Sequence, residues 1–325
     1  MHAIRIEKTG SPDVLAYQEI PQPVPKSGEL LVKVGACGVN FIDCYYRSGL
    51  YKADLPMTIG LEGAGAISAL GEGVTEFKVG ERVAWAAAMG SYAEYAIVPA
   101  AKAVSLPAAI DDRTGAAIML QGMTAAYLSE TTYPITRADT VLVHAGAGGV
   151  GLLLTQMAKR RGARVITTVS TPQKALLSRG AGADEVILYT EQDFEAETKR
   201  LTEGKGVTCV YDSVGVTTFE KSLNVLRPLG YMVLYGTSSG PVPPFDISLL
   251  AAKGSLFITR PSLFSYVAER ADLLKYANVV FAGIGEGWLN IRTEHYYPLA
   301  EAAQAHRDLE ARRTTGKLIL LPSST

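Results

Sequence analysis

Residues 141–151 constrain the fold more than any other stretch of the sequence. The segment opens with an apolar, β-branched run that is typical of a buried parallel strand. Gly146, Gly148 and Gly151 follow in the spacing G-x-G-x-x-G, and a helical pattern continues to about residue 161. Glycines in such a turn let the backbone approach a pyrophosphate closely, and the helix start supplies N–H groups to phosphates. The segment therefore predicts a dinucleotide-binding strand, turn and helix.

Strands and helices alternate around this turn, from residue 139 to about residue 259. The predicted strands are 140–144, 164–169, 185–188, 207–212, 229–235 and 255–259. The predicted helices are 149–161, 171–180, 193–203 and 217–226. This alternation is typical of a doubly wound parallel sheet, so we predict an α/β fold with a Rossmann nucleotide-binding domain.

The flanking segments show other patterns. Short runs separated by Gly and Pro clusters favour a β-rich barrel or sandwich before residue 120. The strands expected there are 3–8, 29–36, 60–70, 81–86 and 92–98, and helical runs follow at 114–120 and 121–130. After residue 263 we expect a long helix to about 281, a loop at 283–287, an amphipathic helix at 299–313 and a last strand at 317–321 that returns to an earlier sheet. His306, on the amphipathic face, is predicted to be a packed or rim histidine.

Composition limits the partners that need to be considered. A length of 325 residues suits about two domains, and a formal net charge of −1 gives no electrostatic case for nucleic acid or an anionic membrane. The sequence has no long apolar window and no signal-peptide pattern, so a cytoplasmic protein that does not enter a membrane is expected. Its three cysteines form no C-x-x-C pair and its four histidines have no metal-ligand spacing. We therefore expect neither disulfides nor a metal site.

The end of the second predicted strand indicates which dinucleotide binds. NAD-type domains place an acidic residue there to hold the ribose 2′-hydroxyl, and residues 169–174 contain no acid. Ser170 leaves room and a hydroxyl, and Lys174 supplies a cation where a 2′-phosphate would sit. This favours NADPH over NADH. The alternative is that Lys174 is a solvated lysine in the first turn of a helix.

Several motifs in order along the chain make it similar to a known family. They are Gly38 to Asp43, Tyr45, Arg47 to Tyr51, Gly60 to Gly65, Gly80 to Val83, the glycine turn, Tyr211 to Gly215 and Thr259 to Leu263. Together they resemble the NADPH:quinone oxidoreductases, the zeta-crystallin-like branch of the medium-chain dehydrogenase/reductase superfamily.

The resemblance implies a discontinuous organisation. A GroES-like catalytic domain would comprise residues 1–123 together with 264–325, and a Rossmann domain would comprise 124–263, with the active site expected in the cleft between them. The resemblance also implies a homodimer that is often formed by pairing edge strands of the nucleotide-binding domains. Residues 255–259 are a candidate edge strand, and an internal strand is the alternative.

The sequence departs from the zinc-dependent alcohol dehydrogenases of the same superfamily. Asn40 stands where those enzymes have a cysteine ligand, and Gly60-Leu61-Glu62 replaces their G-H-E motif. The four-cysteine structural-zinc lobe is missing as well. Metal-assisted alcohol oxidation is therefore not expected. Cys37 is interpreted as a small buried thiol rather than a substitute ligand.

The resemblance places four candidate catalytic residues in a loop and short helix that line the nicotinamide and substrate pocket. Asn40 and Tyr45 would donate hydrogen bonds to a quinone oxygen, Tyr51 would stack on a planar ring, and Asp43 would orient its neighbours or bind cofactor hydroxyls. The alternative is that the tyrosines are packing residues and that Asn40 and Asp43 are turn residues.

The predicted cofactor contacts come from matching positions. Backbone N–H groups of Gly148, Gly149 and Val150 would bind the pyrophosphate. The other residues expected to contact the cofactor are Thr124, Gly146, Gly151, Ser170, Lys174, Tyr189, Ser213, Val214, Ser238, Arg260 and Arg312. Tyr189 and Arg312 would lie near the adenosine and its 2′-phosphate, although each could be an ordinary surface residue, and Arg260 could instead pair with an acid.

The expected reaction is reduction of an o-quinone-like acceptor by NADPH without a metal, in steps of one or two electrons that the sequence does not distinguish. One alternative is an NADPH-dependent 2-alkenal or enone reductase, which uses the same cofactor on a C=C bond. A second is a non-enzymatic NADPH- or RNA-binding protein of crystallin type, against which the near-neutral charge argues.

Overall fold

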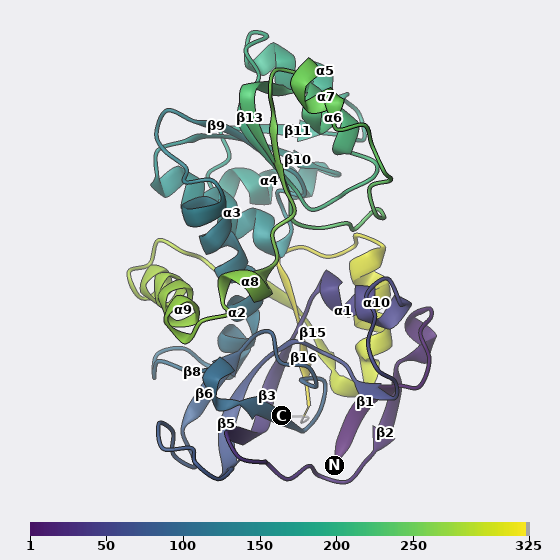
Figure 1. The fold of residues 1–325 in the computed structure, drawn as a ribbon, viewed down its shortest axis with the longest axis vertical. Coiled ribbons are helices and arrows are strands. Elements are labelled where there is room, and N and C mark those ends of the chain that lie inside the picture. The colour runs from purple at the N-terminus through teal and green to yellow at the C-terminus, as the bar shows by residue number, and fades with distance from the viewer. Residues whose placement is uncertain (323–325) are drawn as a thin grey trace. The chain divides into compact units, whose positions relative to one another are not determined.

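The computed structural model describes residues 1–322 and separates them into two compact units (Figure 1). Unit 1 is built from Met1–Met123, Val267–Glu286 and the described residues from Ile291 onwards, and unit 2 from Thr124–Tyr266 and Gly287–Asn290. Both ends of the chain therefore contribute to unit 1. The last three residues of the predicted segment 264–325 lie outside the described residues.

Unit 2 contains a six-stranded sheet in which every pairing is parallel. Its strands are β9 (Thr140–Val143), β10 (Arg164–Val169), β11 (Glu185–Leu188), β12 (Val207–Asp212), β13 (Leu226–Leu234) and β14 (Phe257–Thr259). They lie in the order β11-β10-β9-β12-β13-β14, which is the 3-2-1-4-5-6 order of a Rossmann fold. The predicted α/β doubly wound sheet is confirmed, and β14 lies at its edge.

The helices of unit 2 follow the predicted alternation with different ends. They are α3 (Gly149–Arg160), α4 (Pro172–Gly180), α5 (Phe194–Leu201), α6 (Phe219–Asn224), α7 (Ser248–Ala252) and α8 (Leu263–Tyr266). The prediction for 217–226 was too long because β13 already begins at Leu226. Pro228 and Gly230 both lie within β13, where the pairing with β12 has a register shift between Val207 and Cys209.

Unit 1 contains a seven-stranded sheet and a smaller three-stranded one. The larger sheet has the order β15-β16-β3-β5-β6-β8, with β7 paired to β3, and the smaller has the order β2-β1-β4. The strands are β1 (His2–Ile6), β2 (Ala16–Glu19), β3 (Glu29–Val39), β4 (Met57–Thr58), β5 (Glu62–Leu70), β6 (Arg82–Trp85), β7 (Tyr95–Pro99), β8 (Ala103–Ser105), β15 (Thr293–Pro298) and β16 (Lys317–Leu321). The last strand, β16, returns to an earlier sheet, as predicted, and pairs antiparallel with β3.

The other elements of the chain include α1 (Phe41–Ser48), α2 (Asp112–Tyr127), α9 (Arg270–Gly285) and α10 (Ala302–Glu310). Short turns are η1 (Pro12–Val14), η2 (Ala100–Lys102), the π-helical η3 (Leu128–Thr132) and η4 (Leu299–Glu301). Among the described residues, no helix is long and apolar enough to span a membrane.

Two predictions near helical glycines differ from the structure. The runs 114–120 and 121–130 form one helix, α2, in which a Cβ at Gly122 would lie 2.9 Å from Val280, so a close helix contact explains the glycine. The predicted loop at 283–287 begins too early because α9 continues to Gly285, held by buried residues such as Phe281. Burial of an apolar face offsets the cost of about 1 kcal/mol that each helical glycine imposes.

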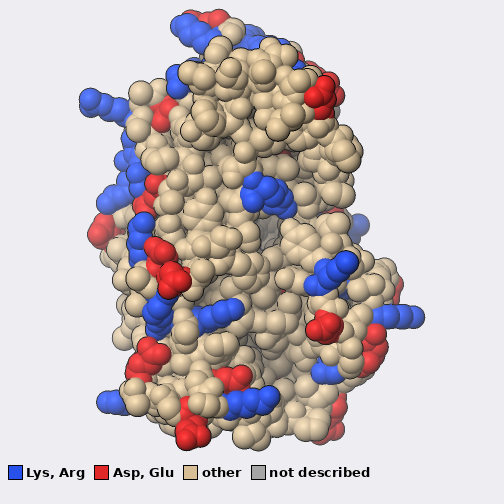
Figure 2. Space-filling model, in the orientation of Figure 1, with Lys and Arg blue, Asp and Glu red and all other residues tan. Residues whose placement is uncertain are grey.

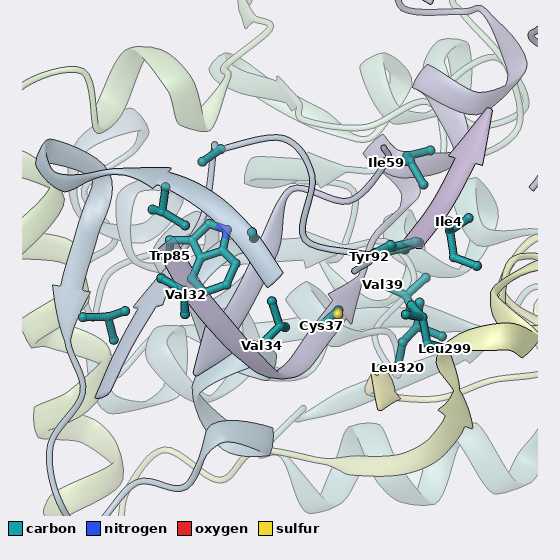
Figure 3. Packing of buried hydrophobic residues seen from close by; sticks show 14 of the residues in the cluster. Ile4, Val32, Val34, Cys37, Val39, Ile59, Trp85, Tyr92, Leu299 and Leu320 are labelled. Atoms are coloured by element: carbon teal, nitrogen blue, oxygen red, sulfur yellow. The ribbon is translucent and has the colours of Figure 1, made fainter. Parts of the chain in front are cut away.

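The core of unit 1 joins segments from both ends of the chain (Figure 3). Trp85 is fully buried, and a Cβ at Gly63 on the paired strand would lie 2.6 Å from its ring. Tyr92 is also fully buried, and its backbone bonds to Ile4 and Ile59 on either side. Cys37 is buried as expected, and its thiol donates to the Ser91 carbonyl at 2.8 Å.

Candidate active site

The glycine turn of unit 2 has the shape of a phosphate cradle. Ala145 adopts a positive φ of 53°, and Gly146 N–H donates to the Thr168 carbonyl at 3.0 Å. A Cβ at Gly146 would lie 2.5 Å from the Thr167 Cβ, and one at Gly151 would lie 2.3 Å from the Ala145 carbonyl oxygen. Side chains at these two positions would therefore displace the turn.

Helix α3 begins directly after this turn, with Gly148 as its N-cap. Leu152 N–H makes the first helical bond, to the Gly148 carbonyl, so the N–H groups of Gly149, Val150 and Gly151 have no partner within the helix. Gly148, Gly149 and Val150 are partly exposed. Donors and a positive dipole end at this position fit an anionic pyrophosphate.

Three predicted cofactor residues come together at the carboxyl ends of β10 and β11. Thr171 caps α4 and accepts the Lys174 N–H at 3.2 Å, while Tyr189 N–H donates to the Val169 carbonyl at 3.1 Å. Thr190 Oγ1 donates to the Ser170 carbonyl at 3.0 Å, which joins the two loops. Ser170, Lys174 and Tyr189 therefore share one edge of the sheet.

Ser213, Val214 and Ser238 meet beyond the ends of β12 and β13. Ser238 N–H donates to the Ser213 carbonyl at 3.1 Å, and the adjoining Ser239 N–H donates to the Val214 carbonyl at 2.7 Å. These two loops belong to the same edge of the parallel sheet as the glycine turn, because all strands run in one direction.

The remaining predicted cofactor residues lie elsewhere. Thr124 is buried within α2. Arg260 follows β14, and its guanidinium donates a hydrogen bond to the Leu234 carbonyl at 3.0 Å. The partner in this contact is a backbone carbonyl and not an acidic side chain. Arg312 belongs to unit 1 and follows α10 in a turn with a positive φ of 58°. Its role at a 2′-phosphate stays a prediction.

The candidate catalytic residues of unit 1 lie within α1 or directly before and after it. Asn40 is its N-cap, and Asn40 N–H donates to Asp43 Oδ2 at 2.8 Å, so Asp43 acts as the acidic member of a capping box. Tyr45 and Tyr51 remain partly exposed with ring centroids 5.3 Å apart, and Tyr51 also meets the edge of Tyr46. The tyrosines thus pack on one another and still offer surface to a ligand.

The Asn40 side chain forms hydrogen bonds with three other polar side chains. We call this group of four residues the Lys317 cluster, and its members are Asn40, Glu62, Gln121 and Lys317. Lys317 Nζ donates to Asn40 Oδ1 at 2.7 Å and forms an ion pair with Glu62, and both charged side chains are almost wholly buried. Gln121 Nε2 donates to the same Asn40 oxygen at 3.2 Å. Asn40 Nδ2 donates to Glu62 Oε2 at 2.8 Å and to the Gly38 carbonyl at 3.3 Å.

The Asn40 amide therefore uses its hydrogen-bonding capacity inside unit 1. A hydrogen bond from its nitrogen to a substrate would require the longer contact to Gly38 to open. Sequence reasoning missed Lys317 and Gln121 as parts of the site. One signal in the sequence could have indicated Lys317, because this lysine stands at the start of an otherwise apolar strand. A lysine buried with such a strand requires a charged or polar partner.

Burial shifts the ionisation of several groups in unit 1. It raises the pKa of Asp43 to about 7, against the opposing effects of the Asn40 N–H, the Lys317 charge and the Tyr92 hydroxyl. Burial also lowers the pKa of Lys317, and the adjacent Glu62 carboxylate opposes that change. For His306, burial and the Arg47 charge lower the pKa to about 3, so this histidine is neutral near neutral pH.

Comparison with known proteins gives consistent matches for both units. Residues 26–108 match the alcohol dehydrogenase GroES-like domain, and residues 149–273 match the zinc-binding dehydrogenase family. A quinone oxidoreductase from Pseudomonas aeruginosa is 45% identical over 98% of this chain and 99% of its own. A 2-haloacrylate reductase from a Burkholderia species is 39% identical over 98% of both chains.

A solved structure matches over the same length. The quinone oxidoreductase of Escherichia coli, determined in complex with NADPH, superposes with a TM-score of 0.97 at 43% identity, covering 99% of this chain and 100% of the other. The Rossmann sheet, the GroES-like unit and these matches define a medium-chain dehydrogenase/reductase. Within that superfamily, the chain belongs to the quinone oxidoreductase family.

Zinc, which the broader family description implies, does not fit the residues of unit 1. The Asn40 side chain, at the position compared with a zinc-ligating cysteine, is bonded to the Lys317 ammonium. A cation bound there would be repelled by that buried positive charge. Within residues 1–322, no cluster of three or more His, Cys, Asp or Glu side chains could hold a metal ion.

The Lys317 cluster yields a prediction about stability. Lys317→Met leaves the Glu62 carboxylate buried without its counter-ion, so we expect a loss of about 3–5 kcal/mol in the free energy of unfolding. The double variant with Glu62→Gln removes both charges and should recover much of that loss. Urea denaturation followed by circular dichroism measures both.

Lys205→Met is the matched control, because Lys205 pairs with Glu203 where both side chains are 79% exposed. Lys205→Met should lower the free energy of unfolding by less than about 1 kcal/mol. Equal losses for Lys317→Met and Lys205→Met would contradict the assigned importance of the buried pair.

Proposed function

We propose that this protein is an NADPH-dependent reductase of quinones that works without a metal ion. The observation that carries the proposal is the match over almost the whole chain to quinone oxidoreductases, one of them determined with NADPH. The loops of unit 2 and the tyrosines of unit 1 support it independently.

NADPH would be held by loops at one edge of the Rossmann sheet. The start of α3 would provide N–H donors for the pyrophosphate, with Gly149 and Val150 among them. The Gly148 N–H, also predicted to bind there, instead donates to the Ala145 carbonyl at 2.9 Å. Ser170, Lys174 and Tyr189 cluster where the adenosine ribose would lie. When bound, the nicotinamide supplies a hydride equivalent. Ser213, Val214 and Ser238 would border the nicotinamide, because their loops follow the next strands along the same edge.

The tyrosines of unit 1 would recognise the acceptor. A quinone already attracts electrons, so its reduction needs hydrogen-bond donors for the developing oxygen anion more than it needs a Lewis acid. The Tyr45 hydroxyl would donate such a bond, while the Tyr51 ring would contact the flat face of the acceptor. The Lys317 cluster would hold Asn40 in one orientation beside them.

A second candidate is reduction of an activated C=C bond. It is favoured by the 39% identity to a 2-haloacrylate reductase. RNA binding receives no comparable support, since Lys and Arg are interspersed with Asp and Glu on the face drawn in Figure 2, rather than gathered in a basic stripe.

Steady-state assays separate the two candidate reactions. With NADPH as the donor, we expect kcat/KM for 1,2-naphthoquinone to exceed that for 2-chloroacrylate or a short 2-alkenal by about tenfold or more, because the site offers donors to a quinone oxygen. NADPH oxidation measured without acceptor is the control. Turnover of the alkene substrates with no turnover of quinone would favour the second candidate.

Lys174 should determine the preference for the phosphorylated cofactor. A charge-assisted hydrogen bond is worth about 1.5–3 kcal/mol, so Lys174→Ala should weaken NADPH binding roughly 10- to 150-fold and leave NADH almost unchanged. Fluorescence titration with each cofactor measures this. Arg179→Ala, in the last turn of the same helix, is the control, and equal losses for NADPH and NADH in Lys174→Ala would refute the assignment.

A homodimer is proposed through the free edge of the Rossmann sheet. Within the described residues, β14 pairs only with β13, and Phe257 on this strand is 48% exposed. An exposed strand edge with an aromatic residue favours pairing with a second copy. Sedimentation equilibrium should give the mass of two chains, and Phe257→Arg should shift the mass towards one chain. A wild-type monomer at high concentration would contradict the proposal.

A further inference from the structure

A chain of buried hydrogen bonds leads from the surface of α10 to the N-terminus of α1. We call it the Asp43 relay, and its members are Asp43, Tyr92, His306, Arg47 and Glu310. The Tyr92 hydroxyl lies 3.0 Å from Asp43 Oδ2 and 3.2 Å from His306 Nε2. His306 Nδ1 lies 3.4 Å from the Arg47 guanidinium, which binds the Glu310 carboxylate at 2.9 and 2.6 Å.

The donors in this relay have one direction. An arginine guanidinium only donates, so His306 Nδ1 accepts and the proton of this neutral histidine sits on Nε2. His306 Nε2–H then donates to the Tyr92 oxygen, which leaves the Tyr92 hydroxyl proton for Asp43. The bonds from Arg47 to His306, from His306 to Tyr92 and from Tyr92 to Asp43 thus point towards the Asp43 carboxyl and stabilise its ionised form, whereas the Arg47 bonds to Glu310 anchor the outer end of the relay.

Burial makes these bonds costly to lose. Asp43, Tyr92 and His306 are fully buried, Arg47 is 3% exposed, and only the Glu310 side chain, at 36%, reaches water among the five. Asp43 Oδ2 accepts both the Tyr92 hydroxyl and the Asn40 N–H, while Oδ1 has no hydrogen-bond partner. The two bonds to Oδ2 are therefore the ones that hold the carboxylate as a cap.

The relay ties α1 to α10 immediately beside the proposed substrate residues. Arg47 and Cys44 of α1 both approach His306 of α10. Tyr45 lies between them in sequence and follows the capped end of the helix by one turn. Displacement of this helix end would move the Tyr45 hydroxyl, which makes the relay a means of fixing its position.

We propose that Tyr92 and His306 are positioning residues, which hold Asp43 as the ionised cap of α1 and thereby place Tyr45 for the quinone. This inference rests on the proposed function for its substrate. Neither residue needs to touch the substrate or the cofactor.

The ionisation of Asp43 makes the relay testable. Burial raises its pKa to about 7, and the Tyr92 hydroxyl acts in the opposite direction. Loss of that hydroxyl should therefore raise the pKa further and protonate the cap at higher pH. The charged or titratable groups that face this carboxyl and its bonded neighbours come from β3, α1, β5, the segment before β7, α10 and β16. They are Cys37, Cys44, Tyr46, Arg47, Glu62, Tyr92, His306, Glu310 and Lys317.

The experiment is the pH profile of kcat/KM for 1,2-naphthoquinone at saturating NADPH. In the wild type, kcat/KM should fall as the pH decreases through about 7, because protonation weakens the cap. Tyr92→Phe keeps the ring and removes the hydroxyl, and it should move the midpoint up by about one pH unit. Asp43→Asn should abolish this inflection.

Matched variants separate the relay from a general loss of packing. His306→Gln retains a donor that can reach Tyr92 and should preserve the midpoint, whereas His306→Leu should raise it as Tyr92→Phe does. Tyr297→Phe is the control, since the Tyr297 hydroxyl donates to Asp308 on α10 at 3.0 Å outside the relay. It should leave the profile unchanged. An unshifted midpoint in both Tyr92→Phe and His306→Leu, or an equal shift in Tyr297→Phe, would overturn the inference.

An infrared titration reads the Asp43 carboxyl directly and does not depend on turnover. The band of the protonated carboxyl that disappears in Asp43→Asn should show the same midpoint as the kinetic profile and the same upward shift in Tyr92→Phe. If the wild type reduces no quinone, the proposed function fails, and the infrared shift still decides the state of the cap. If quinone is reduced but the infrared midpoint is unchanged in Tyr92→Phe, the relay fails alone.

Discussion

The buried ion pair between Lys317 and Glu62 is the interaction on which unit 1 depends. Removing an ammonium and a carboxylate from water costs several kcal/mol for each ion, so the pair is tolerable only where further hydrogen bonds complete it. Asn40 bonds to both partners, and the Leu120 N–H of α2 donates to Glu62 Oε1 at 2.7 Å. One pair of charges thus joins β5, β16, the start of α1 and α2.

This arrangement also determines what the site can do. The Asn40 amide, whose position suggested a hydrogen bond to substrate, is engaged by the pair and by Gln121. The exposed aromatic surface of Tyr45 and Tyr51 then remains for contact with an acceptor. In unit 1, buried charged side chains therefore hold the start of α1 in place, and two partly exposed tyrosines lie on α1 and directly after it.

The sequence predicted those features whose physical causes are local. The glycine turn could be recognised from its spacing within six residues, where a Cβ at Gly151 would meet the nearby Ala145 carbonyl, and the alternation around the turn specified the parallel sheet. The preference for NADPH was likewise predicted from a short segment, the residues directly after β10, which contain no acid. Residues Ser170, Lys174 and Tyr189 could therefore be placed at one sheet edge before their contacts were known.

Features that depend on distant residues could not be predicted in this way. His306 was correctly expected to be packed, but its contacts with Tyr92 and Arg47 join residues more than 200 positions apart. Lys317 and Glu62 are equally remote in sequence, and nothing near either residue specifies the other. Very short strands such as β4 have too few residues for a period to be visible, and α9 continues through glycine because tertiary packing outweighs intrinsic propensity.

The closing of the large sheet by β16 has a consequence for biosynthesis. A ribosome delivers Glu62 255 residues before Lys317, and throughout that interval the carboxylate has no counter-ion. An unpaired carboxylate favours water, so the interior around β5 and the start of α1 is completed only when β16 brings Lys317 to Glu62. The sheet of unit 2 is formed by one contiguous stretch, from β9 to β14, and faces no such delay, so the nascent protein would complete this sheet first and the large sheet of unit 1 last.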